Sequence, residues 1–164
     1  MSAGVLAASG SGGTIAVAGI GLRAQISEMV GAELSLYAPL TEATLTSANN
    51  QARTSVWMAG GGVLFAPLVD RRMSVEVGAG AMATVFRSSG VPNTNNMFFS
   101  VTEARGAVYG RGAARLRLVP HLALRIDVFG GAVISPPHIL FDMQDAGAWG
   151  PGFVAGLGGA EVQF

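Results

Sequence analysis

The sequence predicts an all-β fold: an up-and-down antiparallel transmembrane β-barrel with about seven strands present of an expected eight. Three observations predict this fold. Apolar and polar residues alternate with a period of two, which a strand produces and a helix does not. The alternating segments run for about 10–14 residues, which is enough for the ~9–11 that a tilted strand needs to cross a bilayer. Charged residues fall almost entirely on one face of each segment, as a polar lumen and a lipid-facing exterior require.

The alternation recurs in seven segments, which cover residues 14–26, 29–38, 53–66, 73–85, 105–118, 122–133 and 152–164. The first two place their single charged residues, Arg23 and Glu33, on the face opposite Leu22 and Leu34. The third has two apolar or small faces: Thr54, Val56, Met58, Gly60, Gly62 and Leu64 on one, and Ser55, Trp57, Ala59, Gly61 and Val63 on the other. Each of these segments therefore has one face that suits lipid.

The fourth segment is the clearest, because every odd-numbered residue from Met73 to Val85 is Met, Val or Ala, whereas Ser74 and Glu76 lie opposite. The fifth alternates Arg105, Tyr109, Arg111, Arg115 and Arg117 with Val108, Gly110, Gly112, Ala114, Leu116 and Leu118. The sixth sets Leu122, Leu124, Ile126 and Val128 against Arg125, Asp127 and Phe129. The seventh places Val154, Gly156, Gly158, Ala160, Val162 and Phe164 opposite Glu161 and Gln163.

The connections alternate in length. Short turns are expected at Ser27–Glu28, at Pro67–Arg72 and around Val119–His121, and long polar loops at 39–52, 88–104 and 134–151. The prolines fall in these connections or at the beginning of a strand, where a missing backbone donor does least harm. Short turns on one rim and long loops on the other are typical of periplasmic turns and extracellular loops.

The odd number of strands predicts a missing one. Bacterial barrels close with an even number of strands, so we expect an eighth strand and a signal peptide upstream of Met1. Residues 1–13 are then a flexible Gly/Ser/Ala-rich segment at the end of an extracellular loop, and residues 14–164 form the barrel domain. A transmembrane helix over Ala3–Leu22 is disfavoured because the stretch holds six glycines.

Composition excludes several classes of function. The formal net charge is zero and only 12% of residues are charged, so nothing indicates a nucleic-acid partner. The chain has no cysteine, which excludes a disulfide framework and a thiolate metal site. No pattern indicates a cofactor or a metal.

The last twelve residues, from Phe153 to Phe164, carry a family resemblance. Their alternating apolar residues and terminal aromatic make the chain similar to the small eight-stranded bacterial outer-membrane barrels (OmpA/OmpX-like), without the first strand and the signal peptide. The resemblance implies an outer-membrane location, a lipid-bilayer environment and a C-terminal assembly signal that the barrel-assembly machinery reads, on Ala160, Val162 and Phe164. The segment Leu116–Pro137, with the Trp-Gly and glycine-rich strand that follow, also resembles uncharacterised outer-membrane proteins of the myxobacterial type.

The inward-facing charges are the candidate site. They form an expected lumen polar network of Arg23, Glu33, Glu76, Arg111, Arg115, Arg117, Arg125, Asp127 and Glu161. Because side chains fill the interior of an eight-stranded barrel, the favoured interpretation is a structural plug, with a narrow pore as the alternative. A hydrolase using Ser135, His138 and Asp142 or Asp145 is disfavoured, since nothing indicates that the loop holds them rigidly, and two loop carboxylates fall short of a calcium site.

Three functions stay open. The leading one is a structural or surface-interaction barrel, not an enzyme, which displays loops 39–52, 88–104 and 134–151 to an extracellular partner. The second is a small porin-like channel. The third is a soluble lipocalin-like barrel that binds an apolar ligand, and this alternative requires the apolar faces to point inward.

Overall fold

The computed structural model describes residues 2–10, 13–47, 50–70, 72–91, 100–136, 138–141 and 144–162. Within these ranges every regular element is a β-strand. No helix among the described residues is long and apolar enough to span a membrane.

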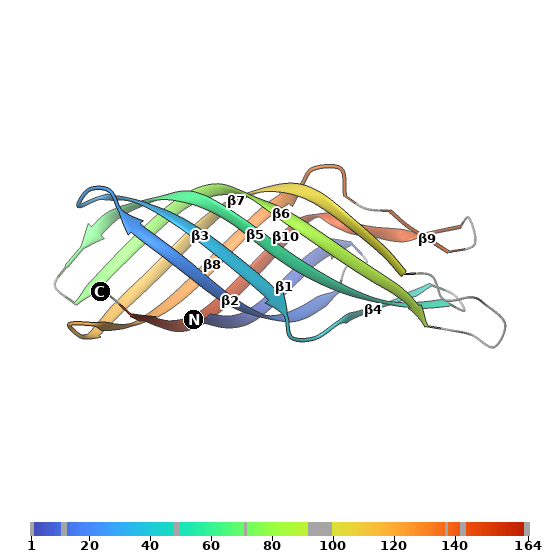
Figure 1. Ribbon diagram of the computed structural model, residues 1–164, viewed down its shortest axis with the longest axis horizontal. Helices are drawn as coiled ribbons and strands as arrows, with labels where there is room; N and C mark the ends of the chain where they lie inside the picture. Colours follow the sequence, from blue (N-terminus) through green and yellow to red (C-terminus); the bar gives the residue numbers. More distant parts are fainter. Residues whose placement is uncertain are drawn as a thin grey trace.

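Eight strands form a closed ring. In ring order they are β1 (Ser2–Gly10), β2 (Thr14–Gln25), β3 (Val30–Pro39), β5 (Asn50–Val69), β6 (Met73–Val91), β7 (Ser100–Val119), β8 (Leu122–Val133) and β10 (Gln144–Val162). All neighbours are antiparallel, and the pairing of β1 with β10 closes the ring. Two short strands, β4 (Ala43–Ser47) and β9 (His138–Phe141), pair with β5 and β10 (Figure 1). The predicted all-β up-and-down barrel is confirmed.

The expectation that residues 1–13 form a flexible loop end is wrong for Ser2–Gly10, which form β1. This strand pairs with β2 from Ser2 opposite Gly19 and with β10 from Ser2 opposite Gly159, so it takes the place in the ring that we had assigned to an upstream strand. The sequence analysis missed this strand, because small residues show little contrast between the two faces of a strand. One of these small residues is required here, since a Cβ on Gly4 would lie 2.7 Å from the Cα of Leu157.

The two rims of the barrel differ, as expected. The short-turn rim holds the turns at 26–29 and 120–121 and the short connection from β5 to β6, where Asp70 N donates to Met73 O at 2.7 Å. The turn after β2 is closed by Ile26 N donating to Val30 O at 2.9 Å. Pro67 is not in a turn but within β5, where the pairing register with β6 shifts between Phe65 and Leu68. Both ends of the chain lie toward this rim, opposite the long hairpins (Figure 1).

The expected loops at 39–52, 88–104 and 134–151 are largely strand where they are described. Strands β5, β6, β7 and β10 are 19–20 residues long, about twice what a bilayer crossing needs. Beyond the membrane a hairpin has no lipid face, so its sequence loses the alternation that identifies the transmembrane part. The long hairpins therefore extend the sheet past the end of the barrel that lies opposite the short-turn rim (Figure 1).

The outer wall is apolar, as the alternation predicts. Its most exposed large side chains include Leu22 at 76%, Ile126 at 65% and Leu34 at 64%. Large apolar side chains exposed over a whole barrel wall are what a lipid environment requires. This orientation contradicts the lipocalin-like alternative, which needs these faces inside.

The inner wall divides into two layers along the barrel axis. The layer nearer the short-turn rim is charged, and the layer nearer the long hairpins is mostly apolar, with Thr54 and Thr84 buried in it. The apolar lumen layer consists of Leu6, Ile15, Val17, Tyr37, Val56, Met58, Met82, Phe86, Tyr109, Phe129, Val133, Phe153, Ala155 and Leu157, all buried. At its base Phe129 stacks on Tyr37, with ring centroids 5.1 Å apart, and meets Phe153 edge-on at 6.1 Å.

Candidate functional site

The charged lumen layer is built by the inward positions of six strands close to the short-turn rim. It comprises Arg23 on β2, Glu33 on β3, Glu76 on β6, Arg111 and Arg115 on β7, Arg125 and Asp127 on β8, and Glu161 on β10. All of them except Arg111 are within six residues of a short turn or of the C-terminal end of β10. The alternation dictates that these side chains point inward, and the antiparallel pairing brings them to one level.

Arg111 lies at the centre of the layer. Its guanidinium forms ion pairs with Glu33 and with Asp127, and the Nη2 atom is 2.7 Å from Asp127 Oδ1. The Nε of Arg111 also donates a hydrogen bond to Asp127 Oδ1 at 3.0 Å. The Arg111 side chain is only 8% exposed, so its charge depends on these two carboxylates for stabilisation.

Arg125 connects Asp127 with the other acids of the layer. It contacts Asp127 Oδ1 at 2.9 Å, Glu161 Oε2 at 3.2 Å and Glu76 Oε2 at 3.3 Å. Arg23 on β2 approaches the same Glu76 oxygen to 2.8 Å. Arg125 also lies 4.0 Å from Glu33 Oε2, so four acids from four strands share one guanidinium.

Arg115 is the fourth arginine of the layer. It donates to Glu161 Oε1 and to Ser74 Oγ, each at 3.1 Å. With Arg115 the layer holds four arginines and four carboxylates, so its formal charge cancels. Buried charges are tolerated when each one has a partner of opposite sign, and that condition is met here.

Arg117 is the one member of the expected network that stands apart. It is exposed near the short-turn rim and has no ion pair with a described residue. Arg105 also points into the barrel but lies near the long hairpins, where it pairs with Glu103 at 2.8 Å. Glu103 was missed because it fell in the expected loop 88–104.

Two tyrosines border the charged layer, and the sequence analysis did not assign them to the site. Tyr109 Oη donates to Glu33 Oε1 at 3.5 Å, and Tyr37 stacks on Phe129 at the base of the apolar lumen layer. The inward alternation of Glu33 with Tyr37 and of Tyr109 with Arg111 was the available signal.

The other candidate residues do not form a site in the described chain. Ala160 and Val162 are exposed on the outer face of β10, and Phe164 lies outside the described residues. Ser135 is exposed in a turn with φ of 52°. The side chains of His138 and Asp145, and the whole of Asp142, lie outside what the structure describes. Among the described residues, no group of His, Asp and Glu is arranged to hold a metal ion.

The closed ring, the apolar outer wall and the filled lumen define the class: an eight-stranded transmembrane β-barrel. Among solved structures the chain is similar to Ail, the attachment invasion locus protein of Yersinia pestis, in complex with the heparin analogue sucrose octasulfate. The TM-score is 0.59 at 10% sequence identity, over 99% of this chain and 95% of that chain. A second structure of Ail matches with a TM-score of 0.55 at 11% identity and the same coverage.

This likeness concerns the fold alone, and it agrees with the eight-stranded barrel that the strand pairing defines. No family model matches the sequence, and no curated protein matches it either.

Proposed function

We propose that this chain is a bacterial outer-membrane protein of the structural or surface-interaction type, with a sealed barrel and a sheet presented to the exterior. The observation that carries the proposal is the filled lumen. The charged lumen layer and the apolar lumen layer lie one above the other, so an ion passing through would have to cross both. A mostly apolar layer is a barrier to ions, and a neutral network of ion pairs offers no free charge to conduct them.

The surface-interaction part rests on the long hairpins. Strands β4, β5, β6 and β7 form a sheet that continues past the barrel, with β5 and β6 paired up to Gln51 opposite Val91. On the far side of β7, pairing with β8 stops at Ala107 opposite Val133, and Gly106 O still accepts from Ile134 N, so residues 100–105 form an edge among the described residues. An exposed strand edge can accept a strand of another protein through backbone hydrogen bonds. Ail, the fold neighbour, is an attachment protein whose structure holds a heparin analogue, which supports an extracellular partner for this chain too.

The finer features belong to the same proposal. The loops at 39–52, 88–104 and 134–151 face the exterior and contact the partner. Ala160, Val162 and Phe164 act as the assembly signal for the barrel-assembly machinery, and the surrounding partner is the lipid bilayer. The kinship is with the small OmpA/OmpX-like barrels and with the myxobacterial type. The proposal includes no catalytic activity and no cofactor.

The sealed lumen is tested by recording from the full chain in planar bilayers. The proposal expects no channel openings at any voltage, in contrast to a porin recorded in parallel. Discrete openings would establish the porin-like alternative instead.

The protruding sheet is tested by replacing residues 89–100, which join the paired Ser88 and Val101, with an Asn-Gly turn. Cells displaying the full chain should adhere to surfaces coated with extracellular-matrix protein or with heparin, and the shortened variant should not. Equal adhesion of the two would place the interaction elsewhere.

A further inference from the structure

The outer wall of the barrel is interrupted between β3 and β5. Pairing of β3 with β5 ends at Tyr37 opposite Met58, and β4 resumes it at Ala43 opposite Thr54. Residues 38–42 therefore lie opposite residues 55–57 alone. The linker, residues 38–42, is two residues longer than the part of β5 that it faces. It therefore cannot stay paired with β5 and moves away from that strand.

Hydrogen bonds hold the linker toward β2 instead. Leu40 N donates to Ala16 O at 2.7 Å, and Ala16 N donates to Thr41 Oγ1 at 2.8 Å. The displacement of the linker opens a hollow of about 540 Å³ against β5, which we call the outer hollow.

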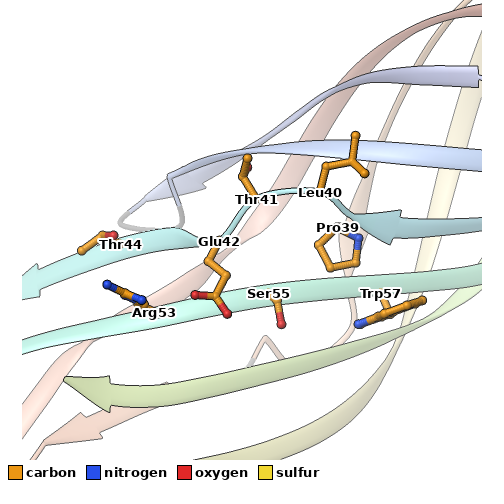
Figure 2. A pocket seen from close by; sticks show the side chains of 8 residues that line it. All are labelled: Pro39, Leu40, Thr41, Glu42, Thr44, Arg53, Ser55 and Trp57. Carbon is orange, nitrogen blue, oxygen red and sulfur yellow. The ribbon is translucent and has the colours of Figure 1, made fainter. Parts of the chain in front are cut away.

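The outer hollow has an apolar end and a polar end. Figure 2 shows Trp57 and Pro39 at one end and Arg53 and Thr44 at the other, with Glu42 extending from the linker toward β5 between them. Residues 54, 56 and 58 of β5 are buried in the lumen, so the odd-numbered Arg53 and Trp57 point away from it. The hollow is thus on the side of the barrel that faces the membrane.

Trp57 marks the depth of the hollow in the membrane. Toward the short-turn rim the outward residues of β5 and β3 are apolar, including Val63 at 58% and Leu36 at 41% exposed. Toward the long hairpins the next outward residues of β5 are Ser55 and Arg53. Tryptophan concentrates at the boundary between hydrocarbon and headgroups, so the polar end of the hollow lies at headgroup level.

A second arginine adds to the positive charge at this level. Arg87 on β6 pairs with Ser55, whereas Arg53 pairs with Ser89, so the two arginines are diagonal neighbours on one face of the sheet. Both are exposed, and neither forms an ion pair with a described residue. The carboxylate of Glu42 accepts hydrogen bonds only, so a ligand in the hollow must also offer donors.

We propose that the outer hollow binds the phosphorylated sugar headgroup of a glycolipid in the outer leaflet. Arg53 and Arg87 bind the phosphate, because guanidinium groups form charge-assisted hydrogen bonds with phosphate oxygens. Glu42 accepts hydrogen bonds from sugar hydroxyls, and Trp57 contacts the apolar part where the acyl chains begin. A soluble anion would use the arginines alone, whereas the hollow also opens onto the apolar wall. The proposal requires only that the outer wall faces lipid, and it is independent of any extracellular partner.

The test uses the full chain in phosphatidylcholine nanodiscs, carrying Trp149→Phe so that Trp57 is the sole tryptophan. The probe is an acylated disaccharide phosphate, titrated while Trp57 fluorescence is recorded. We expect a saturable change, and an increase of about tenfold in the half-saturating mole fraction for Arg53→Gln, with a similar loss for Arg87→Gln. The matched control is Arg72→Gln, which removes an exposed arginine at the short-turn rim and should leave the titration unchanged.

Heat-modifiable migration on a gel verifies that each variant is folded before the titration. Equal half-saturation of Arg53→Gln and Arg72→Gln would overturn the site. Equal binding of the dephosphorylated glycolipid would overturn the role of the phosphate. Competition by inorganic phosphate at the same concentration as the glycolipid would show a site for free anions rather than for a lipid.

Discussion

Arg111 on β7 forms its ion pair with Asp127 on β8 diagonally across the two strands. In the register Arg111 lies opposite Phe129, and Asp127 lies opposite Ala113, yet Nη2 and Oδ1 are 2.7 Å apart. The diagonal leaves the opposite position free for Phe129, so the most buried ion pair and the base of the apolar lumen layer meet at one point of the wall.

Removing Asp127 should destabilise the barrel strongly. Asp127→Ala leaves Arg111 and Arg125 without their shared carboxylate inside the lumen, and loss of one partner of a buried pair costs about 3–5 kcal/mol. Urea unfolding of the refolded protein in micelles, followed by tryptophan fluorescence, measures the change. Arg117→Gln is the control, since Arg117 is exposed and has no ion pair with a described residue, and it should change the free energy of unfolding by less than about 0.5 kcal/mol. Equal effects of the two variants would show that the charged lumen layer is not a stabilising unit.

Truncating Phe129 should also destabilise the barrel. Its ring is 1% exposed and contacts Tyr37, Tyr109 and Phe153, so Phe129→Ala leaves a cavity at the base of the apolar lumen layer. The expected loss is about 3–5 kcal/mol in the same unfolding measurement. Phe129→Leu, which keeps most of the volume, should lose less. A loss of stability no larger for alanine than for leucine would mean that the layer is loosely packed.

Adding a side chain to a glycine that lies against Tyr109 should destabilise the barrel. Gly62, Gly80 and Tyr109 are inward residues of three adjacent strands, and a Cβ on Gly80 would lie 2.7 Å from Tyr109 Oη and 2.8 Å from Gly62 Cα. Because backbone is among the blocking atoms, Gly80→Ala should cost about 1–3 kcal/mol. A Cβ on Gly112 would meet nothing within 4 Å, so Gly112→Ala should change the free energy of unfolding by less than about 0.5 kcal/mol. Equal tolerance of both substitutions would contradict the close approach of β5 and β6.

The sequence was sufficient for the faces of the strands but not for their partners. Alternation is local, so Arg23, Glu33 and Glu76 could be assigned to the lumen from neighbouring residues alone. The diagonal contact of Arg111 with Asp127 depends on the register of β7 with β8, which no local pattern encodes. The network was therefore predicted as a set of residues and not as a set of pairs.

Two kinds of strand were missed for opposite reasons. Strand β1 is too uniform, since apart from Val5 and Leu6 it holds only Gly, Ala and Ser, and this composition resembles a linker. The close approach of Gly4 to β10 becomes visible only in the structure. The outer parts of β5 to β7 are too polar, because a strand beyond the membrane needs no lipid face. The outer hollow was missed with them, since it depends on the mismatch between residues 38–42 and residues 55–57.

Closure of the ring by β1 is the central claim, and a disulfide tests it most directly. The chain has no cysteine, so Leu6→Cys with Ala155→Cys introduces one pair, at positions that lie opposite each other on β1 and β10. Paired residues of antiparallel strands have Cα atoms about 4.5–5.5 Å apart, within the range of a disulfide. Leu6→Cys with Ala113→Cys is the control, because Ala113 is buried on β7, which is not a ring neighbour of β1. After mild oxidation of the full chain in a bilayer, the first pair should cross-link almost completely and shift on a denaturing gel, and the second should stay reduced. Failure of the first pair to cross-link in a folded barrel would show that β1 does not close the ring.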